Sequence, residues 1–399
     1  MYSLIRSTSM FAMVLFAGFF LLASQSTFAQ VTADQLLISE FRLHGPNGAS
    51  DEFIELYNNT DSDITVATTD LSAGWALVAS DGATRFTITN GTMIPARGHY
   101  LGVNSVGYSL TAYPAGNGTT AIGDTTYTTD IPDNAGIALF NTSNPANFTL
   151  ANRLDAVGSI SEANTLYKEG TGYPDLNPFL NVDFSLYRSL STGLPKDTNN
   201  NEVDFVLVDT SATQMCTSTN FQCARLGAPG PENRSSPIQR NALIPASLIA
   251  PCVAASQSPN RVRDTTPGPP LTSSQGTLDT RRRFTNNTGV LVTRLRFRIV
   301  TITSYPPPPA VADLRAITST ALAPFANPCG AIPPTITVQG TTLEEPPSQP
   351  NGGAYNSTLS AGTITLTPLA PGASIDLRFL LGVQQPGSFR FFVNVEALP

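Results

Sequence analysis

Residues 36–43 read LLISEFRL and residues 51–58 read DEFIELYN, two short runs of branched and aromatic side chains separated by a loop that contains Gly45, Pro46 and Gly48. Runs of this length and composition, bounded by turn-forming residues, are typical of β-strands. Similar runs recur along the chain: GWALVAS (74–80), TRFTITN (84–90), HYLGVN (99–104), GIALFN (136–141) and DFVLVD (204–209). No window shows sustained helical periodicity, so the sequence predicts an all-β protein.

Length and composition agree with a folded exported protein. The chain has 399 residues, 13% of them charged, with 30 Gly and 32 Pro. It is too apolar for a disordered chain and too rich in helix breakers for a coiled coil or a helical bundle. Residues 31–240 carry 10 basic and 22 acidic residues, whereas residues 241–399 carry 11 basic and 7 acidic ones. This contrast predicts two units of different surface chemistry.

The second unit shows a clear period of two. Within residues 290–302, Leu295, Phe297 and Ile299 share one face of a strand, and Arg294, Arg296 and Arg298 share the other. One buried and one solvated face per strand indicates an antiparallel sandwich. We therefore predict an antiparallel β-sandwich for the C-terminal unit.

The first 29 residues have the layout of a signal peptide. Arg6 precedes an apolar core at residues 10–23, and Thr27 and Ala29 provide small residues before a cleavage site at Gln30. This core is shorter than the roughly 18–20 apolar residues of a membrane span, although an uncleaved anchor is the alternative. We predict secretion to the periplasm, cell surface or medium, with no span after signal removal. The predicted domains are a signal peptide (1–29), a first domain (31–232), a Pro/Ser/Asn-rich irregular connector (233–275) and a C-terminal sandwich (276–399). Within the connector, a short strand that contains Leu243, Ile244, Leu248 and Ile249 is the alternative.

The four cysteines suit an oxidising compartment. An even number of cysteines in an exported chain predicts disulfides. Three pairings are open, and we favour Cys216–Cys223 with Cys252–Cys329. A zinc site is the alternative, but there is no CxxC pair, and His44 and His99, the only histidines, lie far apart in sequence.

Four ordered motifs in the first domain resemble the lamin-tail domain family. They are Ile38-Ser39-Glu40, the acidic-aromatic run at 51–58, Gly74-Trp75 after Leu71, and a Pro95-x-x-Gly98 turn before a strand. The resemblance covers about residues 34–232 and departs from the family in a polar insertion around 105–130. It implies an immunoglobulin-like sandwich in which Trp75 fills the space between two sheets. The positions that carry the motif are Ser39, Glu40, Glu52, Glu55, Gly74, Trp75 and Gly98.

Glu52 and Glu55 are the carboxylates in this motif that could act as a general acid/base pair or bind a cation. Because they have opposite parity in one strand, they face opposite sides of the sheet and cannot act on one substrate bond. We predict structural hydrogen bonds or ion pairs for both, with ligand or cation contact and catalysis as the alternatives.

Residues 197–204 (DTNNNEVD) place oxygen ligands at alternate positions, as calcium loops do. Glu202 stands where an EF-hand requires glycine, which excludes that motif. A looser calcium site near Asp197 remains open beside a plain Asn-rich turn.

Arginines are the strongest charge feature of the second unit. If strands at 281–284 and 294–298 pair as a hairpin, they form a basic face for an anionic partner such as extracellular nucleic acid, acidic glycan or the acidic first domain of this chain. The alternative is a solvated sheet face whose arginine stems cover apolar surface. The candidate anion-binding residues are Arg281, Arg282, Arg283, Arg294, Arg296 and Arg298.

Nucleophile, metal and phosphate-loop motifs do not occur in this sequence. We predict no catalytic residues, no metal and no cofactor, and an exported scaffold that binds an unidentified protein or envelope partner. The alternatives are an accessory protein that binds nucleic acid or acidic glycan through its arginines, and an enzyme with an unrecognised site.

Overall fold

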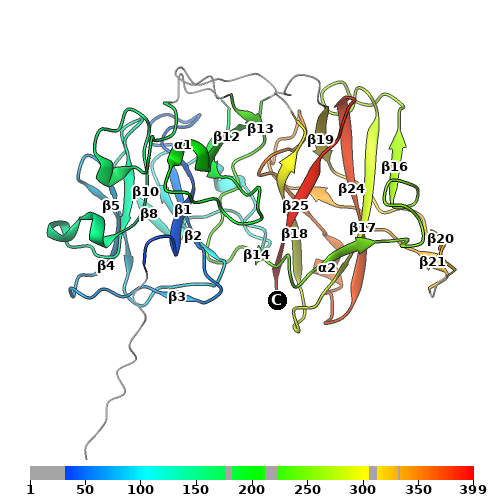
Figure 1. Ribbon diagram of the computed structural model, residues 1–399, viewed down its shortest axis with the longest axis horizontal. Helices are drawn as coiled ribbons and strands as arrows, with labels where there is room; N and C mark the ends of the chain where they lie inside the picture. Colours follow the sequence, from blue (N-terminus) through cyan, green and yellow to red (C-terminus); the bar gives the residue numbers. More distant parts are fainter. Residues whose placement is uncertain (1–31, 176–181, 212–222, 305–311, 331–332) are drawn as a thin grey trace, which may run out of the picture. The chain divides into compact units, whose positions relative to one another are not determined.

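Two β-sandwiches account for the described part of the chain, which in this computed structural model comprises residues 32–175, 182–211, 223–304, 312–330 and 333–399 (Figure 1). The signal segment at 1–29 and Cys216 lie outside the described residues. Residues 31–399 form one compact unit, so the two sandwiches belong to a single body. The expectation of an all-β protein is confirmed.

The first sandwich pairs a seven-stranded sheet with a four-stranded sheet. The larger sheet has the order β13 (Arg225–Leu226), β12 (Phe205–Asp209), β11 (Phe184–Arg188), β1 (Leu36–Arg42), β2 (Phe53–Asn58), β7 (His99–Asn104) and β8 (Thr125–Tyr127). The smaller sheet has the order β10 (Arg153–Val157), β9 (Ile137–Phe140), β4 (Gly74–Ala79) and β5 (Thr84–Thr89). A further pair, β3 (Ile64–Thr65) and β6 (Met93–Ile94), stands apart from both.

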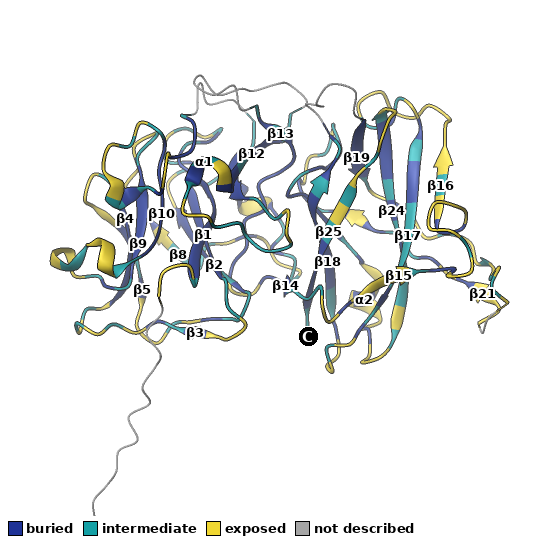
Figure 2. Ribbon diagram, viewed as in Figure 1, coloured by how far each residue is buried: buried dark blue, intermediate teal, exposed yellow. Residues whose placement is uncertain are grey.

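Trp75 lies in the core between these two sheets, as the family resemblance implies. Its side chain is buried in one cluster with Ile38 and Leu56 of the larger sheet and Ile88 of the smaller one. The indole Nε1 donates a hydrogen bond to the Ala67 carbonyl at 2.9 Å, so the one polar atom of the ring is satisfied. Figure 2 shows the strands of this sandwich as largely buried.

The second sandwich is built from two five-stranded sheets. One has the order β14 (Ile238–Gln239), β25 (Phe391–Leu398), β18 (Arg294–Ile302), β23 (Thr358–Ser360) and β22 (Thr342–Leu343). The other contains β15 (Ala246–Leu248), β17 (Thr277–Thr285), β24 (Ser374–Gln385) and β19 (Asp313–Ile317), with β16 (Arg261–Asp264) also on β17. Phe284, Phe297 and Phe379 meet between the sheets, with the rings of Phe284 and Phe297 4.7 Å apart.

The Pro/Ser/Asn-rich stretch at 233–275 differs from the irregular connector suggested by its composition. It supplies β14 to one sheet of the second sandwich and β15 and β16 to the other. Its strands have only two to four residues. The apolar residues around Leu248 indicate a short strand where β15 lies, whereas nothing in the sequence indicates β14 and β16. Backbone pairing with long neighbouring strands, rather than local propensity, orders it.

The hairpin considered for the arginine-rich strands is wrong. β17 pairs with β24, β15 and β16, whereas β18 pairs with β25 and β23 in the opposite sheet. Phe284 of β17 and Phe297 of β18 therefore face each other through the core. The arginines of β17 and β18 cannot form one basic face.

Helices are minor elements of this fold. The two α-helices, α1 (Asn201–Asp204) and α2 (Thr363–Leu366), have four residues each, and the rest are single 3-10 turns. Within the described ranges, no helix has the length and hydropathy needed to cross a bilayer.

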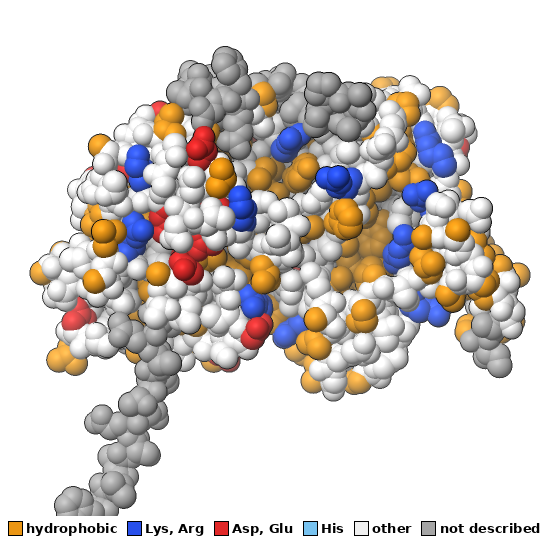
Figure 3. Space-filling model, viewed as in Figure 1, with side chains coloured by type: hydrophobic (Ala, Val, Ile, Leu, Met, Phe, Trp, Pro, Cys, Tyr) orange, Lys and Arg blue, Asp and Glu red, His pale blue; other side chains and the backbone are white. Residues whose placement is uncertain are grey.

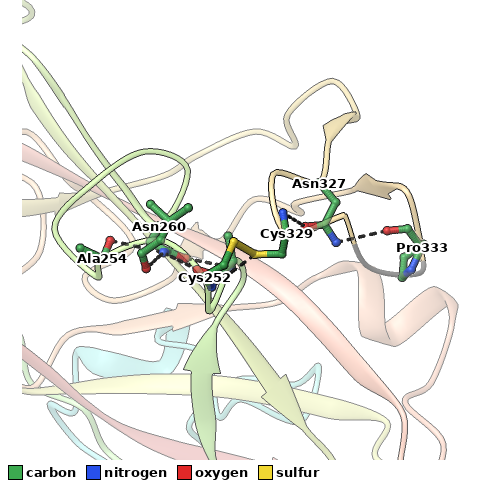
Figure 4. Close-up of a disulfide and its surroundings, with 8 residues drawn as sticks. Cys252, Ala254, Asn260, Asn327, Cys329 and Pro333 are labelled. Carbon is green, nitrogen blue, oxygen red and sulfur yellow. Dashed lines mark hydrogen bonds between the residues drawn. A yellow bond between two sulfur atoms is a disulfide. The ribbon is translucent and has the colours of Figure 1, made fainter.

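The disulfide Cys252–Cys329 confirms one of the favoured pairings (Figure 4). It joins the loop after β15 to the loop after β20 (Phe325–Ala326), with 77 residues of separation. We expect the double variant Cys252→Ala/Cys329→Ala to lose about 2–4 kcal/mol of unfolding free energy, because the unfolded chain gains the entropy of an open loop. Urea unfolding measures this loss, and an unchanged midpoint would contradict it.

Candidate functional site at the junction of the two sandwiches

A buried network of charged side chains lies where the first sandwich meets the second. The first sandwich provides Glu40 from β1 and Glu55 from β2, and the second provides Arg296 and Arg298 from β18 and Glu396 from β25. Glu232, in the segment between β13 and β14, lies between the two groups. None of these six residues is more than 5% exposed.

The two arginines hold two carboxylates at once. Arg296 Nε lies 2.8 Å from Glu396 Oε2, and Arg298 Nε lies 2.9 Å from Glu396 Oε1. The other ends of both guanidinium groups contact Glu232, with Arg298 Nη2 3.0 Å from Glu232 Oε2. The rigid donor fork of arginine suits this double engagement. The face of β18 that its alternating pattern predicts to be solvated is therefore buried under the first sandwich.

The motif residues of the first sandwich complete the network. Ser39 Oγ donates to Glu55 Oε1 at 2.6 Å, and the backbone N–H of Glu232 donates to Glu55 Oε2 at 2.6 Å. Glu40 accepts hydrogen bonds from Ser185 Oγ, from the Gly230 N–H and from Asn356 Nδ2 of the second sandwich. The structure thus places Ser39, Glu40 and Glu55 in contacts that reach the second sandwich.

His99 at the start of β7 extends the network. Its Nδ1 lies 3.0 Å from Glu55 Oε1, and its Nε2 lies 3.0 Å from Glu232 Oε2. The imidazole packs on the ring of Tyr57 at 5.1 Å and is 11% exposed. A cavity of about 40 Å³ adjoins these groups, lined among others by Glu55, His99, Glu232 and Glu396. Sequence reasoning missed His99 because its partners lie 44 and 133 positions away in the chain.

Burial perturbs the acids of this junction. Desolvation, followed by the charge of Glu55, raises the pKa of Glu40 to about 7. Desolvation also raises the pKa of Glu345 to about 8, because Arg298 and Arg296 offset only part of the burial cost. At Glu396 burial acts in the same direction, yet Arg298 and Arg296 outweigh it and hold the pKa below its usual value.

A pH dependence follows from Glu345. Its folded pKa of about 8 lies above its ordinary value of 4.5, so its contribution to stability is complete below pH 4.5 and is lost as pH rises through 8. We expect the unfolding free energy to fall between pH 5 and pH 8 and Glu345→Gln, which keeps an acceptor for Thr358 Oγ1, to flatten this decline. Urea unfolding at several pH values measures the slope. If the unfolding free energy of Glu345→Gln fell with pH as steeply as that of the wild type, titration of other groups would be the cause of the decline.

Glu52 and Glu55 do not meet, as their opposite parity predicts. Glu52 accepts hydrogen bonds from Asn104 Nδ2 at 2.9 Å and from the Ile131 N–H at 2.7 Å, on the side of the strand away from Glu55. Burial raises its pKa to about 7. Both carboxylates thus have partners within the fold, and they form no acid/base pair.

The local backbone geometry explains why positions 74 and 98 are glycine. A Cβ on Gly74 would lie 1.9 Å from the Ile88 carbonyl oxygen of the neighbouring strand. Gly98 closes the turn after Pro95, with its N–H donating to the Pro95 carbonyl at 2.8 Å. These motif positions shape the backbone beside Trp75 and His99.

Arg188 lies at the place where the calcium hypothesis puts a cation. Its guanidinium is buried and contacts Asp155 at 2.8 Å, Asp197 at 3.1 Å and Asp204 at 3.5 Å. Asp204 also accepts hydrogen bonds from the backbone and hydroxyl of Thr198. The acidic loop at residues 197–204 is thus held by its ion pairs with Arg188 and by hydrogen bonds within its own turn.

The other predicted anion-binding arginines are scattered. Arg281 pairs with Asp279 at 2.6 Å and Arg283 with Asp376 at 2.7 Å, so carboxylates neutralise both. Arg282 donates to the carbonyls of Asn260 and Arg281, and Arg294 lies beside Gly118 of the first sandwich. Basic side chains on the face seen in Figure 3 likewise lie apart from one another.

Comparison with known proteins gives one match. Residues 29–157 match the family model of the Lamin Tail Domain. No curated protein and no solved structure matches the chain. The match ends at Val157, whereas the larger sheet of the first sandwich continues through β11, β12 and β13. The lamin tail domain is a non-enzymatic, immunoglobulin-like family that suggests a binding or scaffolding module. The matched residues and the sandwich that they build identify this chain as a protein that contains a lamin tail domain.

Proposed function

We propose that this protein is an exported, non-catalytic scaffold whose lamin tail domain and second sandwich act together as one binding body. The observation that carries the proposal is the buried junction, in which Glu232 and Glu396 engage two arginines of β18. Separating the sandwiches would break the contacts of Arg296 and Arg298 with Glu232 and the hydrogen bond from Asn356 Nδ2 to Glu40, all of them buried. The two sandwiches therefore present their outer surfaces in a fixed relation, which suits a scaffold.

Export rests on the signal layout of residues 1–29 and on the disulfide. Cys252 and Cys329 form a disulfide, and disulfides persist in oxidising compartments outside the reducing cytosol. We expect the source cell to release or display a chain that begins at Gln30. Cell fractionation followed by N-terminal sequencing tests this, and a cytosolic chain that retains its leader would refute export.

Partner binding is tested with the purified full chain and the source cell's envelope fraction. The proposal requires a partner that binds the wild-type chain and binds Arg298→Ala more weakly, because that variant loosens the relation between the sandwiches. The matched control is Arg294→Ala on the same strand, which leaves the contacts of Glu232 and Glu396 intact. Equal capture by all three proteins would show that the joined arrangement is irrelevant to binding.

Binding of an anionic polymer is the second candidate function. Arg261 and Arg282 lie close enough for the charge of Arg261, after burial, to lower the pKa of Arg282, which marks a local excess of positive charge. Most other arginines of this unit are paired with carboxylates, so we expect weak binding to duplex DNA, with a log–log salt slope of about −1 to −2. Filter binding at low and high salt measures it. A slope of about −5 or steeper would favour the polymer-binding function over the scaffold.

A further inference from the structure

Three side chains with metal-binding atoms converge at the junction. Glu55 from β2, His99 from β7 and Glu232 from the segment after β13 each offer one ligand atom, and these atoms lie within 4.8 Å of one another. Carboxylate oxygen and imidazole nitrogen are the donors that Zn²⁺ and similar divalent transition metals accept in proteins. Calcium and magnesium, which prefer oxygen ligands alone, fit this donor set less well.

The imidazole has an atom available for coordination. His99 Nδ1 is buried and makes no hydrogen bond, although Glu55 Oε1 lies only 3.0 Å away. On the other side of the ring, Nε2 lies 3.0 Å from Glu232 Oε2. Two ligands bound at about 2.0–2.1 Å to one ion stand roughly 3.0–3.4 Å apart. Each nitrogen–oxygen pair therefore has the spacing of neighbouring ligands. Because the two nitrogens lie on different edges of the ring, one ion uses only one of them, and the carboxylate that faces the other nitrogen joins the site by a rotamer change.

The charge balance of the junction also favours a cation. Five carboxylates are buried here, those of Glu40, Glu55, Glu232, Glu345 and Glu396, against the guanidinium groups of Arg296 and Arg298. Burial favours the protonated form of Glu40 and Glu345, which leaves Glu55, Glu232 and Glu396 facing the two guanidinium groups. Three carboxylates against two guanidinium groups leave an excess of negative charge, which a bound cation would offset. The adjoining cavity of about 40 Å³ has room for the ion and a water ligand.

We propose that Glu55, His99 and Glu232 bind one divalent transition-metal ion of the Zn²⁺ class, which ties the lamin tail domain to the segment that enters the second sandwich. On binding, the lone pair of one imidazole nitrogen forms the bond to the metal, and any proton on that atom passes to solvent. Affinity therefore increases as pH rises.

The neighbouring arginines are compatible with this site. Arg298 keeps its hydrogen bonds to Glu396 and Asn356 whether or not Glu232 holds a metal. Its Nη2 lies 3.0 Å from Glu232 Oε2, so a metal bound at that oxygen would replace this one ion-pair contact. Arg296 engages the other oxygen of Glu232 and orients the carboxylate, as outer partners of metal ligands commonly do.

The direct test is titration of the full chain, carrying a tag without histidine, with ZnCl₂ after removal of metal by EDTA. The two histidines of the chain give separate imidazole signals in a ¹H–¹⁵N spectrum. We expect the His99 signals to shift at one equivalent of Zn²⁺ while those of His44 stay in place. At a free Zn²⁺ concentration about 100-fold above Kd, the Tm should rise by about 4 °C.

Matched variants separate this site from adventitious binding. His99→Gln and Glu232→Gln are expected to weaken Zn²⁺ binding at least about 100-fold, whereas His44→Gln, a change to the only other histidine, leaves it unchanged. Thermal melts in EDTA confirm that each variant folds. The proposal is overturned if no Zn²⁺ binds, if the His44 signals respond instead, or if His99→Gln binds Zn²⁺ as the wild type does. None of these outcomes bears on the scaffold function, which is tested by partner capture.

Discussion

Arg298→Ala is expected to lower the unfolding free energy by about 3–5 kcal/mol, the largest effect that we predict for an ionic residue in this protein. Arg298 is 3% exposed and contacts Glu232 at 3.0 Å and Glu396 at 2.9 Å. Removing it leaves two buried carboxylates with only Arg296 to balance them. The loss therefore comes from uncompensated charge rather than from the modest net value of the original ion pair.

Chemical denaturation measures this loss against two controls. Arg294→Ala, four residues earlier on β18 and partly exposed, should change stability by no more than about 0.5 kcal/mol. Arg298→Lys should recover only part of the loss, because an ammonium group cannot span Glu232 and Glu396 as a guanidinium fork does. If Arg298→Ala and Arg294→Ala were equally mild, the junction would be a weak contact and the scaffold proposal would lose its main support.

Trp75→Ala is expected to cost about 3–5 kcal/mol by leaving a cavity between the two sheets of the lamin tail domain. The side chain is 2% exposed and packs against residues from both sheets. Trp75→Phe keeps most of the ring and loses the hydrogen bond to the Ala67 carbonyl, so its cost should be smaller.

Leu71 provides the control for this second prediction. It belongs to the same sequence motif as Trp75, four positions earlier, yet it is 96% exposed. Leu71→Ala should therefore shift the urea midpoint very little. A Leu71→Ala effect as large as that of Trp75→Ala would mean that the motif contributes by some route other than core packing.

Much of the fold could be predicted from the sequence because it depends on local patterns. Alternation within residues 290–302 indicates which side chains face the core, and Leu295, Phe297 and Ile299 are indeed buried. The opposite parity of Glu52 and Glu55 likewise predicts that they stay apart. The hairpin considered for β17 and β18 is wrong, because alternation shows which side chains share a face of a strand but not which strands pair with it.

The candidate site could not be predicted in the same way. Glu55, His99 and Glu232 come from three distant segments, and Arg296 and Arg298 have the alternation of an ordinary solvated face. Only the apposition of the two sandwiches converts that face into a buried surface.

By itself, the sequence determined the all-β class and the motif of the lamin tail domain, and it predicted disulfides without fixing which cysteines pair. These follow from side-chain periodicity, turn residues and cysteine count, which act over a few positions or over composition. Tertiary structure alone decided that Glu232 bridges the two sandwiches and that five buried acids share two arginines. Electrostatic interactions depend on distances in space and on exclusion of water, and neither is encoded in the spacing of residues along the chain.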